Sequence, residues 1–245
     1  NANIGIHYES KSSNPGRGQI TDVIIRSPHT VGAYIRDTLD FSYVSNVKVY
    51  GSSDLKASGT GFIFGQNDAV RVTGCYVTGA SVGFEFNDKK ESQSTWGTFR
   101  SLTAEDVDTA VRFSSVSTSL YMQPTMLMNS TFSARKVGIE VTAGCRSLTS
   151  FSSCTIRVSG GPAVKLSGKG SITVQGCTLE SSSQTAVEIA QCENAIFTGN
   201  TVKAGKTGFD IANFRPNALV VTNNTIQAST RINDRSPSGD YKSLQ

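Results

Sequence analysis

The sequence predicts an all-β fold in which one chain winds into a parallel β-solenoid of about nine coils. The first observation is composition: 37% of the 245 residues are hydrophobic, 23 are glycine and only 6 are proline, with many Ser, Thr and Asn between short β-branched and aromatic runs. The second is a five-residue motif that recurs along the chain. The third is an apolar–polar alternation at period two between the copies, which is typical of strands. No segment has helical spacing, so no helix is expected.

The recurring motif contains a small residue, then an apolar residue, then a residue that is charged in most copies, and then a second apolar residue. Examples are "TAVEI" at 185–189 and "TGFDI" at 207–211. The small residue falls at Gly61, Gly83, Ala110, Gly138, Ala163, Ala186 and Gly208. Successive copies are therefore 22 to 28 residues apart, which we interpret as one coil per copy. A single coil cannot bury its apolar face alone, so equivalent residues of successive coils must stack on one another.

Stacking of the copies predicts two interior columns. The first contains Phe62, Phe84, Val111, Ile139, Val164, Val187 and Phe209, and the second contains Phe64, Phe86, Phe113, Val141, Leu166, Ile189 and Ile211. Between the copies lies a strand, a bend and another strand, for example in "VRVTGCYV" at 70–77. The bends predict a side-chain ladder of Cys75, Glu105, Ser130, Cys154, Cys177, Asn200 and Asn224. The five cysteines are an odd number in a chain that does not need disulfides, and we expect them to be reduced.

The coil length, the three strands per coil and the Asn, Ser and Cys ladder resemble the right-handed, single-stranded parallel β-helix of the pectin-lyase-like superfamily. The resemblance covers roughly residues 20–232 and is closest to the bodies of phage tailspikes, or capsule depolymerases. It implies a homotrimer located on a virion tail or outside the cell, with a bacterial surface polysaccharide or another anionic or neutral polysaccharide as its partner. No short motif of one particular enzyme family is present.

The ends of the chain are expected to differ from this body. Residues 1–19 are expected to be a cap or the remnant of a preceding coil, and residues 233–245 a polar tail or linker. No signal peptide is visible, and no apolar stretch is long enough for membrane insertion. The net charge of +4 is spread along the chain, so nucleic acid is not an expected partner.

Chemistry is expected on the outward position of the motif. Its residues are Ile63, Glu85, Arg112, Glu140, Lys165, Glu188, Asp210 and Arg231. If coils stack about 4.8 Å apart, these residues form a charged stripe along the helix axis. Two interpretations stay open: a surface ladder of ion pairs that only stabilises the coil, or a stripe that contains a carboxylate pair for glycoside hydrolysis.

The first choice of site is the neighbourhood of an acidic cluster and two long connections. Its catalytic candidates are Glu85, Asp106, Asp108, Arg112 and Glu140, and its substrate-binding candidates are Trp96, Tyr121 and Lys165. The second choice is Glu188 with Asp210, two acids on consecutive coils, where repulsion is expected to raise one pKa.

The resemblance implies a polysaccharide-binding protein, and the acids of the stripe predict that it cleaves its ligand by glycoside hydrolysis with a carboxylate pair. One alternative is a lyase that acts on a uronic-acid glycan, with Arg112 or Lys165 as the base and Ca²⁺ held by the acids of "AEDVD" at 104–108. Another is a non-catalytic adhesin or structural spike. No cofactor or resident metal is expected for the hydrolase.

Overall fold

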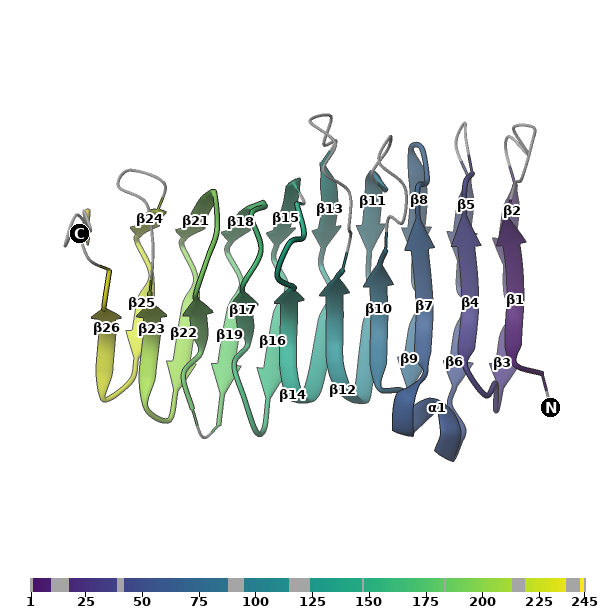
Figure 1. Cartoon of the computed structure of the whole chain (residues 1–245), viewed down its shortest axis with the longest axis horizontal. Helices are drawn as coiled ribbons and strands as arrows, with labels where there is room; N and C mark the ends of the chain where they lie inside the picture. Colours follow the sequence, from purple (N-terminus) through teal and green to yellow (C-terminus); the bar gives the residue numbers. More distant parts are fainter. Residues whose placement is uncertain are drawn as a thin grey trace.

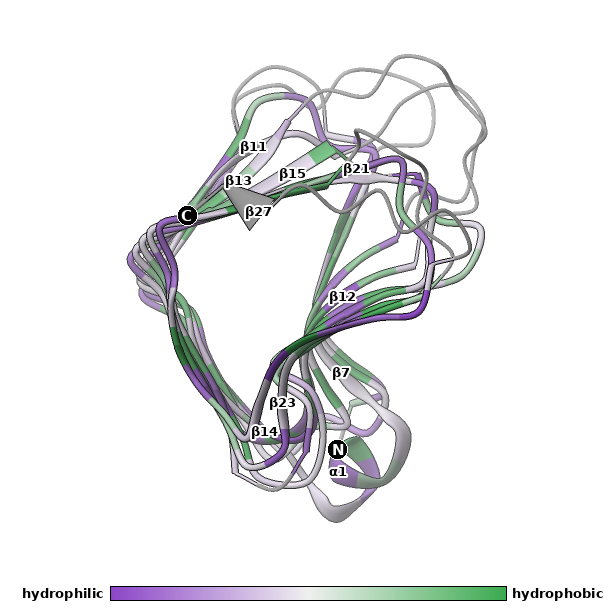
Figure 2. Ribbon diagram, turned by 90° about the vertical axis from the view of Figure 1, so that its left-hand side faces the viewer, coloured by the Kyte–Doolittle hydropathy of each residue, from purple (hydrophilic) through white to green (hydrophobic). Residues whose placement is uncertain are grey.

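The computed structural model describes residues 2–9, 18–38, 42–87, 95–114, 124–146, 148–182, 184–212, 219–236 and 243–244. The chain forms a parallel β-solenoid, with most coils contributing three strands (Figure 1). Viewed along the axis, the coils superpose around one interior (Figure 2). The predicted all-β parallel coil is therefore confirmed. The expected count of about nine coils differs slightly, because the chain makes about eight turns between β2 and β24.

One face of the coil is a 10-stranded parallel sheet with one strand from each coil. Its strands are β2 (Gln19–Thr21), β5 (Tyr43–Ser45), β8 (Val70–Thr73), β11 (Gly97–Arg100), β13 (Thr125–Met128), β15 (Leu148–Ser152), β18 (Ser171–Gln175), β21 (Asn194–Thr198), β24 (Leu219–Thr222) and β27 (Ser243–Leu244).

The other two faces belong to a 17-stranded sheet made of two rows. The row that carries the recurring motif consists of β1 (Ile4–Glu9), β4 (Val31–Arg36), β7 (Thr60–Gly65), β10 (Val82–Phe86), β17 (Val164–Leu166), β20 (Val187–Ile189), β23 (Thr207–Ile211) and β26 (Thr230–Asp234). The second row consists of β3 (Ile24–Arg26), β6 (Lys48–Tyr50), β9 (Tyr76–Thr78), β16 (Thr155–Val158), β19 (Thr178–Ser181), β22 (Thr201–Ala204) and β25 (Thr225–Gln227). Two long strands, β12 (Thr103–Phe113) and β14 (Thr131–Val141), run through both rows and around the corner between them.

One helix interrupts the corner between the two rows, although the sequence predicted none. It is α1 (Ser53–Ser58), and the Ser52 side chain caps it by accepting a hydrogen bond from the Leu55 backbone N–H. Leu55 is fully buried. A six-residue helix with one buried position has no periodicity to detect, which explains why sequence spacing missed it.

The two predicted interior columns are confirmed by the strand register. Phe84 pairs with both Phe62 and Val111, and the column continues in register to Phe209. In the second column the ring centroids of Phe86 and Phe113 lie 4.7 Å apart in a stacked arrangement. Burial of each large apolar side chain contributes about 1.5–3 kcal/mol relative to exposure. These columns hold successive coils in register and so align the outward residues between them.

The bend after the 10-stranded sheet repeats a left-handed backbone conformation. Positive φ values occur at Asp22, Asn46, Gly74, Ser101, Asn129, Ser153, Gly176, Gly199 and Asn223. In the later coils the residue after the bend accepts a hydrogen bond from the backbone of the coil before it: Cys177 N–H donates to Asn200 Oδ1 at 2.9 Å, and Asn200 N–H donates to Asn224 Oδ1 at 2.9 Å. The ladder is confirmed in these coils, and all five cysteines are buried and free.

One predicted member of the ladder was wrong. Leu102, not Glu105, occupies the ladder position, and its N–H donates to Ser130 Oγ at 3.1 Å. The bend in this coil is at Ser101, so β12 has begun by residue 103 and Glu105 is exposed on its outer side. A carboxylate in this interior would carry a desolvation cost that Leu102 avoids.

The first described strand and the last are part of the coil. β1 pairs in parallel with β4, and β27 pairs with β24. Within the described ranges, no helix has the length and apolar character needed to span a bilayer.

Candidate functional site

The charged stripe is aligned as predicted over six rungs. Glu85 pairs with Arg112, and the register continues through Glu140, Lys165, Glu188 and Asp210. The last predicted member was wrong: Asn233, not Arg231, lies opposite Asp210. The motif is degenerate in this final copy, and a shift of two residues keeps side chains on the same face, so alternation alone does not define the register.

At the N-terminal end of the stripe, the two acids Glu85 and Glu140 already have hydrogen-bond or ion-pair partners. Glu85 accepts hydrogen bonds from Ser114 Oγ at 2.6 Å and from Thr60 Oγ1 at 3.3 Å. Arg112 Nε donates to Glu140 Oε2 at 3.0 Å, and the Glu140 side chain is only 19% exposed. Arg112 therefore separates Glu85 from Glu140 and neutralises the second of them.

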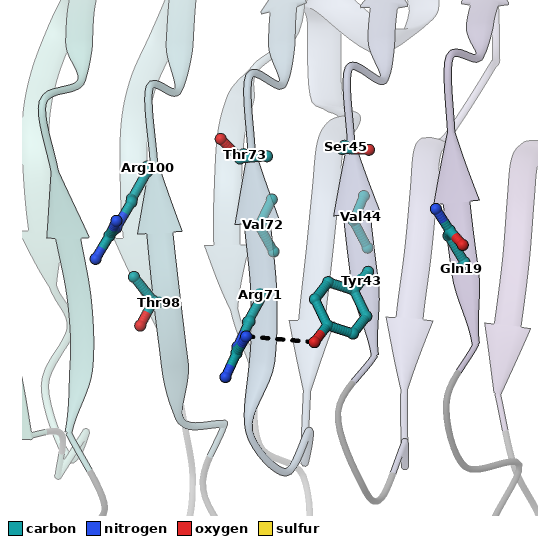
Figure 3. Close-up of a pocket in the computed structure, with 9 residues that line it drawn as sticks. All are labelled: Gln19, Tyr43, Val44, Ser45, Arg71, Val72, Thr73, Thr98 and Arg100. Atoms are coloured by element: carbon teal, nitrogen blue, oxygen red, sulfur yellow. Dashed lines mark hydrogen bonds between the residues drawn. The ribbon is translucent and has the colours of Figure 1, made fainter.

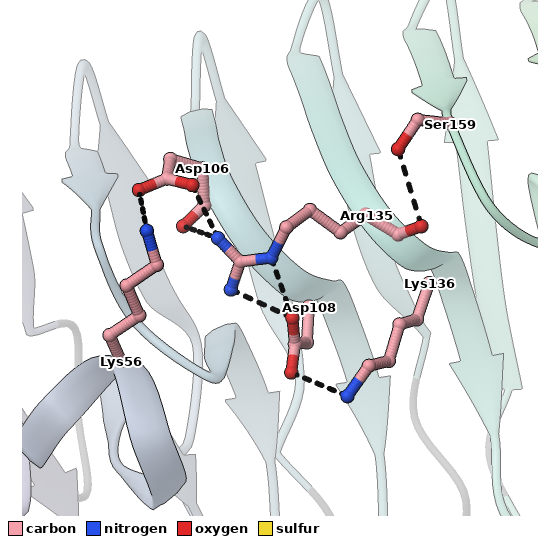
Figure 4. Close-up of polar contacts among 6 residues, drawn as sticks. All are labelled: Lys56, Asp106, Asp108, Arg135, Lys136 and Ser159. Atoms are coloured by element: carbon pink, nitrogen blue, oxygen red, sulfur yellow. Dashed lines mark hydrogen bonds and ion pairs between the residues drawn. The ribbon is translucent and has the colours of Figure 1, made fainter.

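Asp106 and Asp108 lie at the corner between the two rows, in a network of cations (Figure 4). The guanidinium of Arg135 bonds both carboxylates, with a distance of 2.7 Å from Nε to Asp108 Oδ1. Lys56 Nζ from α1 lies 2.8 Å from Asp106, and Lys136 Nζ lies 2.9 Å from Asp108.

This network keeps both corner acids ionised. The Lys56 hydrogen bond and the charge of Arg135 lower the pKa of Asp106, while the Lys136 hydrogen bond, followed by Arg135, lowers the pKa of Asp108. The backbone at Asp106 is left-handed, with φ of 49°, where the register of β12 against β14 shifts. Both acids therefore make ion pairs and are poor proton donors near neutral pH.

The five catalytic residues of the first-choice site do not converge. Asp108 precedes Arg112 by four residues on one strand, which corresponds to roughly 13 Å at the rise of an extended chain. Glu85, Arg112 and Glu140 share the outer face of the motif row, whereas Asp106 and Asp108 share the corner with α1 (Figure 4).

The predicted sugar-binding residues are also apart. Trp96 is half-buried just before β11, where its backbone N–H donates to the Asn67 carbonyl oxygen at 3.0 Å, so it lies at the start of a strand of the 10-stranded sheet and not at the corner. Tyr121 lies outside the described residues. Lys165 lies on the stripe between Glu140 and Glu188.

The second-choice pair is the one that the structure brings together. Glu188 on β20 and Asp210 on β23 are register partners, so their backbones are about 4.8 Å apart. Burial of the Glu188 carboxyl raises its pKa and the charge of Asp210 adds to this, although Lys165 and Arg235 oppose the shift.

Asp210 has a different environment. Arg235 binds its carboxylate with both Nη2, at 2.7 Å, and Nε, at 3.1 Å, while Asn233 Nδ2 donates to it at 2.8 Å. The two adjacent acids thus have different environments: burial raises the pKa of Glu188, whereas the Asp210 carboxylate accepts hydrogen bonds from Arg235 and Asn233. The sequence did not point to Arg235, because it lies beyond the last recognisable motif copy.

Among the residues that the structure describes, no group of three or more His, Cys, Asp and Glu side chains is arranged to hold a metal ion. Glu105 instead accepts a hydrogen bond from the Tyr76 hydroxyl at 3.0 Å. The cations around Asp106 and Asp108 occupy the oxygens that Ca²⁺ would need.

Comparison with protein families gives a match to the right handed beta helix region over residues 91–232, more than half of the chain. The chain belongs to this right-handed β-helix family. Comparison with curated proteins and with solved structures returned no significant match. The family match agrees with the stacked coils and says nothing of a reaction.

Proposed function

We propose that this β-helix binds an extended polysaccharide along its charged stripe and hydrolyses it, with Glu188 as the general acid and Asp210 as its carboxylate partner. The observation that carries the proposal is the asymmetry of the two register partners: burial raises the pKa of Glu188, whereas Arg235 holds Asp210 as an ion pair. A glycosidase needs this division between a carboxyl group that donates a proton and one that stays ionised.

The spacing supports the same chemistry. Retaining glycosidases hold their two carboxyl groups about 5–5.5 Å apart, and adjacent rungs of a parallel sheet are about 4.8 Å apart. In this mechanism Glu188 protonates the leaving oxygen while Asp210 attacks the sugar carbon. Glu188 then removes a proton from the water that releases the product.

The substrate class follows from the shape of the stripe. Its residues run along the axis on consecutive rungs, which suits a linear polymer better than a compact ligand. Lys165 is the register partner of Glu188, and in this proposal it binds a hydroxyl or an acidic group of the sugar next to the cleaved bond. The resemblance to tailspike bodies supports a bacterial surface polysaccharide as the substrate, and a trimeric assembly outside the cell.

Product chemistry tests the proposal. The protein is incubated with a panel of bacterial capsular and lipopolysaccharide glycans, and both reducing ends and ultraviolet absorbance are followed. Hydrolysis releases reducing ends without new absorbance. We expect Glu188→Gln to abolish the release, while the matched variant Glu180→Gln, on the second row, retains it.

Three results would contradict the proposal. Products that absorb in the ultraviolet would identify a lyase, with Lys165 as the first candidate for its base. Binding without shortening of any glycan would identify an adhesin. Full activity of Glu188→Gln would remove Glu188 from the mechanism even if hydrolysis occurs.

A further inference from the structure

A groove lies on the outer face of the 10-stranded sheet, away from the charged stripe. It has a volume of about 560 Å³ and crosses four neighbouring strands, β2, β5, β8 and β11 (Figure 3). The side chains that matter below are Gln19, Tyr43, Arg71, Thr73, Thr98 and Arg100. The volume is in the range that small ligands occupy in proteins, about 300–1,000 Å³.

The charge of this sheet is confined to the groove. The strands of the 10-stranded sheet contain no Asp or Glu, and their only basic residues are Arg71 on β8 and Arg100 on β11. Arg71 pairs with Thr98 and Arg100 with Thr73, so the two arginines are diagonal neighbours whose backbones are about 8 Å apart. Figure 3 shows both guanidinium groups directed toward the same end of their strands. Arg100 makes no ion pair with an acid among the residues that the structure describes.

An exposed aromatic residue completes the arrangement. Tyr43 is 42% exposed, and Arg71 lies beside it, with its guanidinium carbon 5.5 Å from the ring centroid and Nη1 3.3 Å from the hydroxyl. The contact holds the Arg71 guanidinium in the groove (Figure 3). At the adjoining bend, Asp22 accepts a hydrogen bond from Asn46 Nδ2 at 2.6 Å.

We infer that this groove binds an acidic saccharide, a sugar chain that carries carboxylate or sulfate groups. The two planar guanidinium groups match such anions, which they can bind through paired hydrogen bonds. Thr73, Thr98 and Gln19 present the hydroxyl and amide groups that hydrogen-bond sugar hydroxyls, and Tyr43 presents an aromatic surface beside them. Two cations are too few to track the phosphates of a nucleic acid. The site is separate from the Glu188–Asp210 pair, and it does not depend on cleavage.

Binding measurements on the intact chain test this inference. Titration calorimetry with an oligogalacturonate, a sulfated dextran oligomer and an uncharged dextran oligomer is expected to show binding of one or both acidic probes and none of the uncharged one. Which acidic probe binds more tightly distinguishes carboxylate from sulfate. Each of Arg71→Ala and Arg100→Ala should weaken this binding about tenfold, as expected for loss of a hydrogen bond to a charged group.

The controls separate the groove from overall charge and from folding. The double variant Lys48→Ala/Arg231→Ala removes two positive charges elsewhere and should bind like the unchanged protein. Arg71→Lys/Arg100→Lys keeps the charge but loses the planar fork, and it should bind more weakly. Equal binding of the uncharged oligomer, unchanged binding in Arg71→Ala/Arg100→Ala with native circular dichroism, or tighter binding of an oligothymidylate would each overturn the inference. Glycan hydrolysis by these variants is measured separately. Loss of the binding inference therefore leaves the proposed hydrolysis by Glu188 and Asp210 standing.

Discussion

Two acid pairs in this molecule have opposite environments. Asp106 and Asp108 are close in sequence and share one cation, Arg135, which lies between them with Lys56 and Lys136 at the sides. Glu188 and Asp210 are 22 residues apart in sequence, and stacking of the coils makes them neighbours. The pKa of Asp106 and of Asp108 is lowered, whereas that of Glu188 is raised.

The difference shows why an acidic run in a sequence is weak support for catalysis. At the corner, three basic side chains from α1 and β14 reach the acids, and the result is a structural ion-pair network. On the stripe, Arg235 binds Asp210 through Nε and Nη2, and the Glu188 carboxyl is half-buried beside a like charge. The basic partners are therefore shared unequally between the two stripe acids, which is the basis for proposing Glu188 as a proton donor.

The largest expected effect is on cleavage. Asp210→Asn should reduce the rate of glycan hydrolysis by about 10²-fold or more, because the reaction needs both carboxyl groups. Asp106→Asn should leave the rate within about twofold, since general acid–base catalysis requires contact with the reacting atoms. Initial rates of reducing-end release from one glycan measure both. A slower reaction in Asp106→Asn than in Asp210→Asn would reverse the assignment of the two pairs.

The next effect is on stability at the corner. Arg135→Ala should lower the free energy of unfolding by about 1–2 kcal/mol, because it leaves two carboxylates with fewer hydrogen bonds. The matched variant Arg157→Ala breaks a single pair with Glu180 in which the arginine side chain is 55% exposed, and it should cost less than about 1 kcal/mol. Urea unfolding compares them. Equal losses would mean that the corner network adds nothing beyond isolated surface pairs.

The pH dependence of stability should have opposite signs at the two pairs. The lowered pKa values of Asp106 and Asp108 mean that their stabilisation is present above the ordinary value of 3.8 and is lost as pH falls through the folded values. The raised pKa of Glu188 means that its burial has no cost below the ordinary value of 4.5, and that the cost appears as pH rises through the folded value.

Unfolding at a series of pH values checks both signs. Asp106→Asn/Asp108→Asn should flatten the acid side of the stability curve. Glu188→Gln should remove the loss of stability that accompanies ionisation of Glu188 as pH rises. If Asp106→Asn/Asp108→Asn makes the acid side steeper, the corner acids are not stabilised as carboxylates.

The smallest effect is on the titration of Glu188 itself. Lys165→Met should raise the pKa of Glu188 further, because it removes a nearby positive charge, while Asp210→Asn should lower it by removing the like charge. Carboxyl ¹³C chemical shifts followed by NMR give both directions. Arg157→Met, which contacts Glu180, serves as a control that should leave the Glu188 titration unchanged. An unchanged titration in both Lys165→Met and Asp210→Asn would show that burial alone controls this group.

Much of the scaffold was predictable, because each copy of the motif has to satisfy the same interior. Phe84, Val111 and Ile139 are stacked as expected, and so are the charged residues between the two columns. The errors occur where the repeat loses its regularity. Glu105 was assigned to the ladder because the bend comes earlier in that coil, and Arg231 was assigned to the stripe because the final copy is degenerate.

The sequence by itself determined the coil, the two apolar columns and the outward stripe, because these depend on side chains that repeat at a constant spacing and must be buried together. Only the tertiary structure decided which acids are neutralised. Arg135 reaches Asp106 and Asp108 from the next coil, Lys56 reaches Asp106 across a corner, and Arg235 reaches Asp210 from beyond the last motif copy. Electrostatic partners are set by distance in space, and a linear pattern does not specify the distance between long side chains on different coils.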